Sequence, residues 1–353
     1  METIGIGVIG CGKIAQVRHL PEYAENPNAR IVALYDVNFE RAKELAVKYN
    51  AKAYATLEEL LSDKDVDAVS VCVANFAHCS VTVQALRSGK HVLCEKPMAT
   101  TIEECELMVR TAEECEKKLL IGQNQRLAKA HTRAKKLISY GMLGQIITFR
   151  TAFGHSGPEN WSIDPGRGTW FFDKNKAAMG VMADLGIHKT DLIQYLIGQD
   201  VVAVTSRVLT LHKTYPDGTP INVDDNAFCI YEMSGGAVGT LASSWTYYAA
   251  EDNSTVIFGT KGTMRIYDSD HFPIDVRNIT NERIMFDVED IQTNDNQSKS
   301  GVIDVFVDAI MNDTEASLDA KTVLPAMRAV FASIESSTKG CRIEIPENRI
   351  PKQ

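Results

Sequence analysis

The stretch Ile4-Gly5-Ile6-Gly7-Val8-Ile9-Gly10-Cys11-Gly12-Lys13-Ile14-Ala15 decides the fold of this chain. It begins with an apolar run that predicts a β-strand, and it passes directly into the spacing G-x-G-x-x-A at the start of a predicted helix. Gly10 permits a tight turn, Gly12 lets backbone N–H groups approach a pyrophosphate, and Ala15 keeps the helix close to the sheet. The stretch therefore predicts the first strand, turn and helix of a dinucleotide-binding unit.

The residues that follow alternate short β-branched runs with longer helical patterns as far as residue 122. Predicted strands cover residues 4–9, 31–35, 68–73, 91–94 and 119–121, and predicted helices cover 38–49, 80–87 and 101–116. This alternation is typical of βαβ units and of a parallel sheet.

The pattern changes after Gly122. A helix is predicted over 129–140 and a strand over 146–152, and strands separated by short turns follow at 202–211, 227–233, 237–245, 255–258 and 263–267. Consecutive strands with short turns predict antiparallel pairing, and helical patterns return at 302–311 and 322–337. We expect a dinucleotide-binding domain over 1–122 and a substrate-binding and oligomerisation domain over 123–353, whose C-terminal segment is free to pack back on the first domain.

Length and charge exclude several classes of protein. The 353 residues correspond to roughly two domains of about 150 residues each. The 46 acidic residues outnumber the 37 basic ones, which disfavours nucleic acid and anionic membranes as partners. No apolar run approaches the roughly 20 residues of a membrane span, and the start has no basic leader region, so we expect a cytoplasmic protein.

The eight cysteines form no C-x-x-C pair, which favours reduced, buried thiols and no zinc site.

Asp36 points to the identity of the cofactor. It ends the second predicted strand, 24 residues after Gly12, where a carboxylate accepts a hydrogen bond from the adenosine ribose 2′-OH. The same carboxylate repels the 2′-phosphate of NADP, so the sequence favours NAD over NADP. Arg41 is the one nearby residue that offers a 2′-phosphate a partner, and its alternative role is an exposed helix residue or a cover on the adenine.

Glu95-Lys96-Pro97 follows the fourth predicted strand. Ligands of parallel sheets bind at the carboxyl ends of the strands, and Pro97 restricts Lys96 to an extended conformation or forms a cis bond with it. Lys96 is therefore placed to stabilise a substrate alkoxide. The alternative is a surface lysine beside a turn.

Asp184, His188 and Asp191 have the spacing i, i+4, i+7, which places them on one face of a regular helix. A histidine beside a carboxylate forms a general acid/base pair. A solvated polar face and a metal site remain alternatives, although no further metal ligands are evident.

Together these motifs resemble the glucose-fructose oxidoreductase and inositol dehydrogenase (Gfo/Idh/MocA) family of NAD(P)-dependent enzymes, and the resemblance covers essentially the whole chain. It implies an α/β protein with an N-terminal Rossmann domain and a C-terminal α+β domain that has an open, mostly antiparallel sheet. It also implies an active site containing Lys96, Asp184 and His188, and a homo-oligomer (dimer or tetramer) formed through the exposed face of the second sheet. The family's Pro-Asn-x-x-His stretch appears as Ala74-Asn75-Phe76-Ala77-His78, where Ala74 departs from the pattern.

The residues expected to bind the cofactor are Gly10, Gly12, Lys13, Ile14, Asp36, Asn75, His78, Glu95 and Lys96. The loop over residues 153–172 mixes hydrogen-bonding groups with flat rings, which suits a sugar or polyol such as an inositol. The residues expected to contact this substrate are His155, Trp161, Asp191 and Tyr247.

The reaction expected from these groups is hydride transfer from a secondary alcohol to the nicotinamide. His188 is the predicted base, Asp184 orients it, and Lys96 stabilises the alkoxide; Lys96 is the alternative base. Two rival functions remain open: a redox-neutral glycosidase or epimerase with tightly bound NAD, and a non-catalytic cofactor-binding sensor.

Overall fold

The computed structural model describes residues 3–268, 271–288 and 299–346. These residues form two compact units. The first holds residues 3–124, 161–166 and 299–324, and the second holds 125–160, 167–268, 271–288 and 325–346. The domain boundary between residues 122 and 123 remains a prediction.

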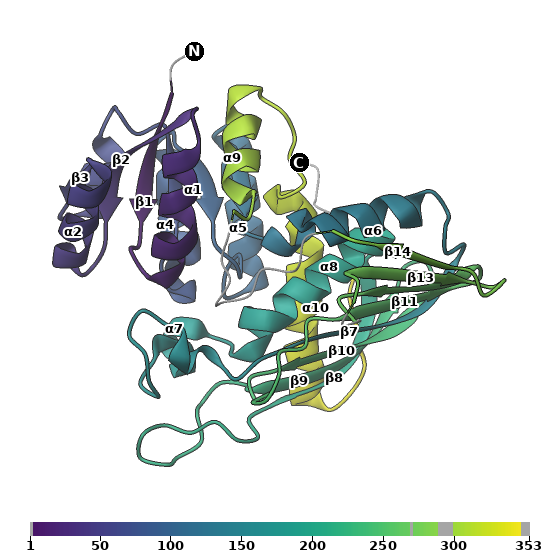
Figure 1. Cartoon of the computed structure of the whole chain (residues 1–353). Coiled ribbons are helices and arrows are strands. Elements are labelled where there is room, and N and C mark those ends of the chain that lie inside the picture. The colour runs from purple at the N-terminus through teal and green to yellow at the C-terminus, as the bar shows by residue number, and fades with distance from the viewer. Residues whose placement is uncertain (1–2, 269–270, 289–298, 347–353) are drawn as a thin grey trace. The chain divides into compact units, whose positions relative to one another are not determined.

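A parallel sheet forms the centre of the first unit, with the strand order β3-β2-β1-β4-β5-β6 (Figure 1). Its strands are β1 (Ile4–Ile9), β2 (Ala29–Tyr35), β3 (Lys52–Tyr54), β4 (Ala68–Val71), β5 (His91–Cys94) and β6 (Leu119–Ile121). β1, β4 and β6 are buried at every position, as expected for a sheet covered on both faces. The strand order reverses between β1 and β4, the point at which ligands bind outside the carboxyl ends of such sheets.

The helices of the first unit connect these strands or come from the C-terminal part of the chain. They are the π-helical turn η1 (Ala15–His19), α1 (Leu20–Glu25), α2 (Phe39–Tyr49), α3 (Leu57–Ser62), the 3-10 turn η2 (Asn75–Ala77), α4 (His78–Arg87), α5 (Ile102–Glu114) and α9 (Val302–Met311). The side chain of Asn26 donates to Asp304 in α9 at 2.8 Å, and the N–H of Ile121 donates to the carbonyl of Leu318 at 2.9 Å. Residues 299–324 thus pack on the N-terminal sheet unit.

The second unit is built on a nine-stranded sheet with the order β14-β13-β12-β11-β7-β10-β9-β8-β15. All neighbouring strands pair antiparallel except β7 and β10, which run parallel. Its strands are β7 (Ile146–Gly154), β8 (Val201–Leu209), β9 (Asn226–Met233), β10 (Val238–Ser244), β11 (Thr255–Gly259), β12 (Gly262–Ile266), β13 (Ile274–Asn278), β14 (Arg283–Phe286) and β15 (Ile343–Glu344). The predicted fold class, an α/β protein with a parallel sheet followed by a mostly antiparallel one, is confirmed.

Helices cover one face of this second sheet. The helical segments are η3 (Asn124–Leu127), α6 (Lys129–Ser139), η4 (Pro158–Asn160), η5 (Trp170–Phe172), α7 (Lys174–Ala177), the π-helical turn η6 (Met182–Gly186), α8 (Ile187–Ile197) and α10 (Ala320–Lys339), most of which belongs to this unit. The buried Tyr231 of β9 lies with its hydroxyl 2.9 Å from Thr190 in α8 and 3.3 Å from Ser333 in α10. The neighbouring residues Phe228 and Ile230 remain 44% and 48% exposed, so the other face of the sheet is open.

Several short elements were not predicted, namely β3, α3, α7, β13, β14 and β15. β3 has three residues and none of them is fully buried, so it has no apolar run to mark it. The predicted regular helix through Asp184 also differs from the structure, because a π-helical turn precedes α8 and changes the spacing of side chains around the helix axis.

The cysteines agree largely with the prediction. All eight are free; Cys115 is half-buried, Cys341 is exposed and the other six are buried. Among the described helices, none combines the length and apolarity that a bilayer span requires.

Candidate active site

The glycine turn after β1 is shaped by close backbone contact. Gly10 has φ +92°, and a Cβ there would lie 2.6 Å from the carbonyl oxygen of Cys72, just beyond β4. Only glycine fits this position. A Cβ at Gly12 would meet no atom within 4 Å, so the turn leaves open space where a pyrophosphate needs to approach the backbone. Lys13 and Ile14 follow it, both half-buried at the start of the helix.

Asp36 stands at the end of β2 and is 7% exposed. Its Oδ2 accepts a hydrogen bond from the N–H of Cys11 at 2.6 Å, and its Oδ1 accepts one from the N–H of Asn38 at 2.7 Å. The carboxylate is therefore held against the glycine turn, with lone pairs left for a ribose hydroxyl. Arg41 lies 3.8 Å from Asp36 and 3.6 Å from Asp164, so its charge already faces two carboxylates.

The segment after β4 contains Asn75 and His78. Both are buried, at 6% and 1% exposure. His78 Nδ1 lies 2.6 Å from the carbonyl oxygen of Pro97, and Nε2 lies 3.1 Å from that of Val73. Ala74 has φ −69° and ψ 151°, which proline also adopts, so its departure from the family pattern leaves the backbone in a proline-compatible shape.

Glu95, Lys96 and Pro97 follow β5 at the same edge of the sheet, and the Lys96–Pro97 peptide is cis. Glu95 is 5% exposed, and Oε1 lies 2.9 Å from His19 Nε2 and 3.8 Å from Arg18. Burial opposes ionisation of this carboxyl, but the hydrogen bond and charge of His19 and the charges of Arg18 and Lys96 lower its pKa to about 2. Lys96 itself is half-buried.

Asp184 and His188 lie in the second unit, on η6 and at the start of α8. The indole Nε1 of the fully buried Trp245 donates to Asp184 Oδ2 at 3.0 Å. The ring of His188 is 6.0 Å from that of Phe153, centre to centre, and His188 is 7% exposed. Asp184 therefore has a fixed partner, and His188 packs beside an aromatic ring of β7.

Asp224 holds the start of the helix that carries these two residues. Its Oδ1 accepts from the N–H of Gly180 at 2.7 Å and its Oδ2 from that of Met182 at 2.8 Å, while its carbonyl accepts from the N–H of Val181. A Cβ at Gly180 would lie 1.9 Å from that carbonyl oxygen. Burial raises the pKa of Asp224, against the lowering effect of these N–H groups. Sequence analysis missed Asp224, because its contacts lie more than 40 residues away along the chain.

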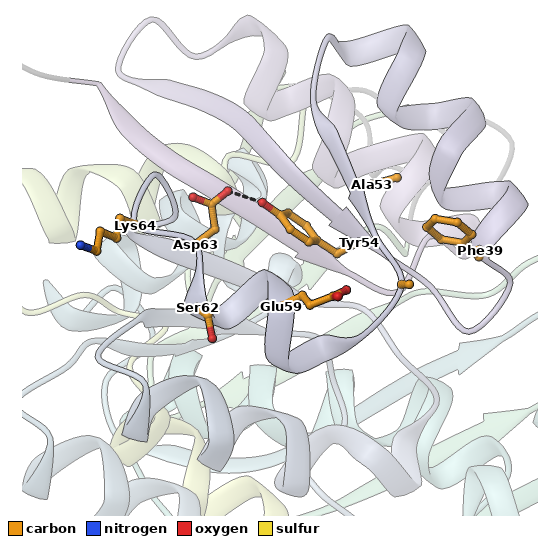
Figure 2. A pocket seen from close by; sticks show the side chains of 8 residues that line it. Phe39, Ala53, Tyr54, Glu59, Ser62, Asp63 and Lys64 are labelled. Carbon is orange, nitrogen blue, oxygen red and sulfur yellow. Dashed lines mark hydrogen bonds between the residues drawn. The ribbon is translucent and has the colours of Figure 1, made fainter.

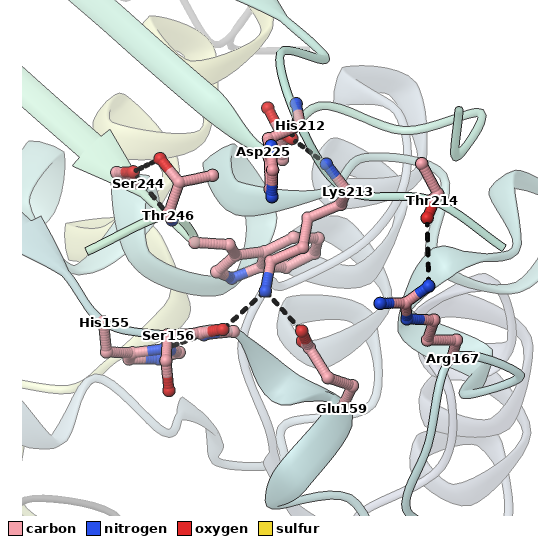
Figure 3. A network of polar contacts seen from close by, with 12 residues as sticks. His155, Ser156, Glu159, Arg167, His212, Lys213, Thr214, Asp225, Ser244 and Thr246 are labelled. Carbon is pink, nitrogen blue, oxygen red and sulfur yellow. Dashed lines mark hydrogen bonds and ion pairs between the residues drawn. The ribbon is translucent and has the colours of Figure 1, made fainter. Parts of the chain in front are cut away.

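Its neighbour Asp225 organises the loop over 211–213 (Figure 3). Its carboxylate accepts from the N–H groups of Leu211, His212 and Lys213 at 2.7–2.8 Å. The ammonium of Lys213 donates to the carbonyl of Ser156 at 2.5 Å and to the carboxylate of Glu159. This network fixes the loop that follows β7, which contains the predicted substrate residue His155.

The remaining predicted substrate residues have different surroundings. The N–H of Tyr247 donates to the carbonyl of His155 at 3.3 Å, and His155 Nδ1 accepts from the N–H of Gly157 at 2.9 Å. Asp191 is 1% exposed and forms a two-point ion pair with Arg126 at 2.5 and 2.7 Å. Trp161 groups with the first unit together with residues 162–166, whereas the rest of the predicted loop belongs to the second unit.

The predicted residues therefore form two sets. In the first unit, the turns after β1, β2, β4 and β5 bring the cofactor residues and Lys96 to the carboxyl edge of one sheet. In the second unit, η6, α8 and the loops beside β7 and β10 hold Asp184, His188, His155 and Tyr247. A shallow groove elsewhere, at the edge strand β3, is lined by Phe39, Tyr54, Glu59 and Asp63 among others and contains no predicted site residue (Figure 2).

The dinucleotide fits the first set, because the open space at Gly12 and the oriented Asp36 carboxylate supply what a pyrophosphate and a ribose require. In the described part of the chain, no cluster of three or more His, Cys, Asp or Glu side chains is arranged to hold a metal ion.

Both the N-terminal and the C-terminal part of the chain match models of known protein families. Residues 4–123 match the model of an oxidoreductase family with an NAD-binding Rossmann fold, and residues 131–265 match the GFO/IDH/MocA C-terminal domain. The chain is 34% identical to glucose-6-phosphate 3-dehydrogenase of Bacillus subtilis over 63% of this chain and 62% of that protein. It is 26% identical to D-glucoside 3-dehydrogenase of Escherichia coli over 96% of this chain and 97% of that protein. Among solved structures, an oxidoreductase domain protein from Kribbella flavida matches with a TM-score of 0.86 and 25% identity, over 98% of this chain and all of that one.

Proposed function

The chain belongs to the Gfo/Idh/MocA family of oxidoreductases, whose first domain is an NAD-binding Rossmann fold, and from this premise we propose that it oxidises a secondary hydroxyl of a sugar or cyclitol with NAD. The observation that carries the proposal is the position of Lys96. It follows β5 at the carboxyl edge of the sheet whose first turn is Gly10-x-Gly12, so one unit supplies both a dinucleotide site and a cation for the reacting oxygen.

Each residue has a defined role in this proposal. Bound NAD supplies the hydride acceptor. Lys96 donates a hydrogen bond to the substrate oxygen and stabilises negative charge that develops there. His188 accepts the hydroxyl proton, and Asp184, held by Trp245, orients the imidazole. Lys96 is the alternative base for the same proton.

The choice of NAD over NADP rests on Asp36 and Arg41. Asp36 presents a carboxylate that two backbone N–H groups fix in place, and the charge of Arg41 faces two carboxylates, those of Asp36 and Asp164. The Asp36 carboxylate would repel a 2′-phosphate, and the positive charge of Arg41 is already offset by these two carboxylates.

The substrate class rests on the relatives and on the loop after β7. The two relatives described above are named as 3-dehydrogenases of a glucose phosphate and of glucosides. In this chain, His155 and the Lys213–Glu159 pair supply donors and acceptors suited to hydroxyl groups, in the same unit as Asp184 and His188.

We also propose a homo-oligomer formed through the open face of the second sheet. Phe228, Ile230 and Val238 are each between 44% and 48% exposed on the neighbouring strands β9 and β10 of that sheet. Burying such a face is favourable. Light scattering of the wild-type protein and of Ile230→Glu tests it: we expect an oligomer that the substitution dissociates, and a monomeric wild type would overturn the proposal.

The function is tested by mixing purified protein with NAD, and separately NADP, and a panel of inositols, hexoses, hexose phosphates and glucosides at mildly alkaline pH. We expect nicotinamide reduction with NAD and at least one of these polyols. If no compound supports reduction and NAD is found already bound to the purified protein, a redox-neutral sugar-modifying enzyme replaces this proposal. A protein that binds NAD weakly and turns over nothing would instead be a sensor.

A further inference from the structure

Two buried histidines contact the segment Glu95–Pro97 within the first unit. His19, on η1, is 0% exposed, and His78, at the start of α4, is 1% exposed. His19 reaches the carboxylate of Glu95, and His78 reaches the carbonyl of Pro97. Lys96 lies between these two contact points, and the proposed function gives it a part in the chemistry.

The contacts of His19 form a chain in which every donor has an acceptor. Tyr23 OH lies 2.8 Å from Ser70 Oγ, and Ser70 Oγ lies 3.0 Å from His19 Nδ1. His19 Nε2 lies 2.9 Å from Glu95 Oε1. Because a carboxylate only accepts, Nε2 carries the proton that it shares with Glu95.

The chain ends at the backbone of the lysine. Glu95 Oε2 accepts from the N–H of Lys96 at 3.1 Å. Arg18 lies 3.8 Å from the same carboxylate, and a Cβ at Gly122 would come within 3.1 Å of it. The carboxylate of Glu95 is thus fixed by charge, hydrogen bonds and packing, and it fixes the peptide of Lys96 in turn.

His78 holds the other end of the segment. Burial lowers the pKa of His78 against the effect of the two carbonyl groups that face it. Its shorter contact is 2.6 Å from Nδ1 to the carbonyl oxygen of Pro97, against 3.1 Å from Nε2 to that of Val73, and since a carbonyl oxygen only accepts, the N–H at Nδ1 donates to Pro97. His78 therefore ties the residue after Lys96 to the end of β4.

We propose that His19 and His78 are positioning residues for Lys96, which hold the backbone on either side of the lysine and so direct its ammonium toward the reacting oxygen. The inference rests on the proposed function, because the contacts of His19 with Glu95 and of His78 with Pro97 position Lys96 only if Lys96 takes part in the reaction. For His78 it replaces direct cofactor contact, expected from the family resemblance, with a contact to the segment that carries the lysine.

Paired substitutions separate positioning from general support of the fold. Asparagine places its amide where histidine has Nδ1, and glutamine places it where histidine has Nε2. His19→Gln therefore keeps the donor to Glu95, whereas His19→Asn loses it. His78→Asn keeps the donor to Pro97, whereas His78→Gln loses it. Both members of each pair remove an aromatic ring, so they share the cost of repacking.

The measurements are kcat, KM, the Kd for NAD and the thermal midpoint of each full-length variant. We expect His19→Asn and His78→Gln to lower kcat about 10- to 100-fold, the scale of a reacting group misplaced by about an ångström, with the Kd for NAD unchanged. His19→Gln and His78→Asn should keep kcat near wild type. Tyr23→Phe, which alters only the far end of the chain, is the matched control and should also keep kcat.

Two results would overturn the inference: equal loss of kcat within each pair, or variants whose Kd for NAD changes while kcat does not. If His19→Asn does not fold, Glu95→Gln tests the same link, and a kcat equal to wild type there counts against positioning. Lys96→Ala is measured in parallel. If Lys96→Ala keeps full activity, the proposed function of the lysine fails; if it is inactive while His19→Asn and His78→Gln match wild type, only this inference fails.

Discussion

Trp245 and Asp184 are joined by a hydrogen bond of 3.0 Å from the indole Nε1 to the carboxylate Oδ2. Trp245 is completely buried, and its backbone N–H donates to the carbonyl of Asp225 at 2.8 Å. Trp245 is therefore held by hydrogen bonds of both its ring and its backbone, and its ring holds one oxygen of Asp184 in place. The proposed role of Asp184, which is to orient the imidazole of His188, requires such support.

We predict that Trp245→Phe lowers kcat about tenfold, because it removes one donor to Asp184 and keeps most of the ring. Steady-state kinetics with the substrate found in the panel measures this. Trp170→Phe is the control, since Trp170 stacks on Phe171 and its substitution leaves the hydrogen bond from Trp245 to Asp184 in place. Equal effects of the two substitutions would contradict the role of Trp245.

Lys96→Ala and His188→Ala should each lower kcat/KM roughly 100-fold or more, because each removes a group proposed to act on the reacting oxygen or its proton. The Kd for NAD and the thermal midpoint show whether the variants remain folded and loaded. Lys43→Ala, which breaks an exposed pair with Glu40 and a cation–π contact with Phe39, is the control. Turnover within a few-fold of wild type in either variant would refute the corresponding assignment.

Asp36→Ser should shift the preference of the enzyme from NAD toward NADP, because it removes the charge that repels a 2′-phosphate and leaves Arg41 with one fewer carboxylate. The ratio of kcat/KM for the two cofactors is the measurement. Asp36→Ser combined with Arg41→Ala should lose the gain with NADP. An unchanged ratio in Asp36→Ser would show that Asp36 does not select the cofactor.

Asp191→Ala should destabilise the protein by about 3–5 kcal/mol, because it removes the carboxylate that neutralises the buried Arg126. Chemical denaturation measures this loss. The matched control is Glu232→Ala, which breaks an exposed pair with Arg342 and should cost no more than about 1 kcal/mol. If Asp191→Ala instead left stability intact and abolished activity, Asp191 would be a substrate residue, as the sequence suggested.

Acid should destabilise the fold through His131. This residue is 0% exposed, and burial, followed by the charge of Lys189, lowers its pKa to about 3. The unfolded chain takes up a proton near pH 6.5 and the folded chain does not, so the stability contribution is complete above pH 6.5 and is lost progressively as the pH falls toward 3.

His131→Asn retains a donor toward the carbonyl of Gln125, which His131 Nδ1 contacts at 2.7 Å, and it does not titrate. We therefore expect wild type to lose about 2 kcal/mol more than this variant between pH 6.5 and pH 5. Urea unfolding at the two pH values gives the difference. Parallel losses in both proteins would show that His131 does not contribute.

The first half of the fold followed from local sequence. Gly10 and Gly12 lie next to an apolar strand, and each of the turns that carry Asp36, Asn75 and Lys96 follows a short apolar strand, so the parallel sheet and the edge at which ligands bind could be inferred together. The short strand β3 could not be inferred, because its three residues, one exposed and two half-buried, have no hydrophobic pattern. The spacing of Asp184, His188 and Asp191 also misled, because a π-helical turn cannot be distinguished from an α-helical one by residue types alone.

The sequence by itself determined the fold class and the cofactor turn, and it predicted Lys96, Asp184 and His188 as reactive groups, since each of these inferences depends on residues near one another in the chain. The tertiary structure decided which groups support them. Asp224 accepts hydrogen bonds at the start of the helix that carries Asp184, more than 40 residues away in the chain. His19 contacts Glu95, 76 residues away, and Arg126 forms an ion pair with Asp191, 65 residues away. In a folded interior, each buried charge and each buried hydrogen-bond donor must be paired with a partner. These partners lie far apart along the chain, so the spacing of residues in the sequence does not reveal them.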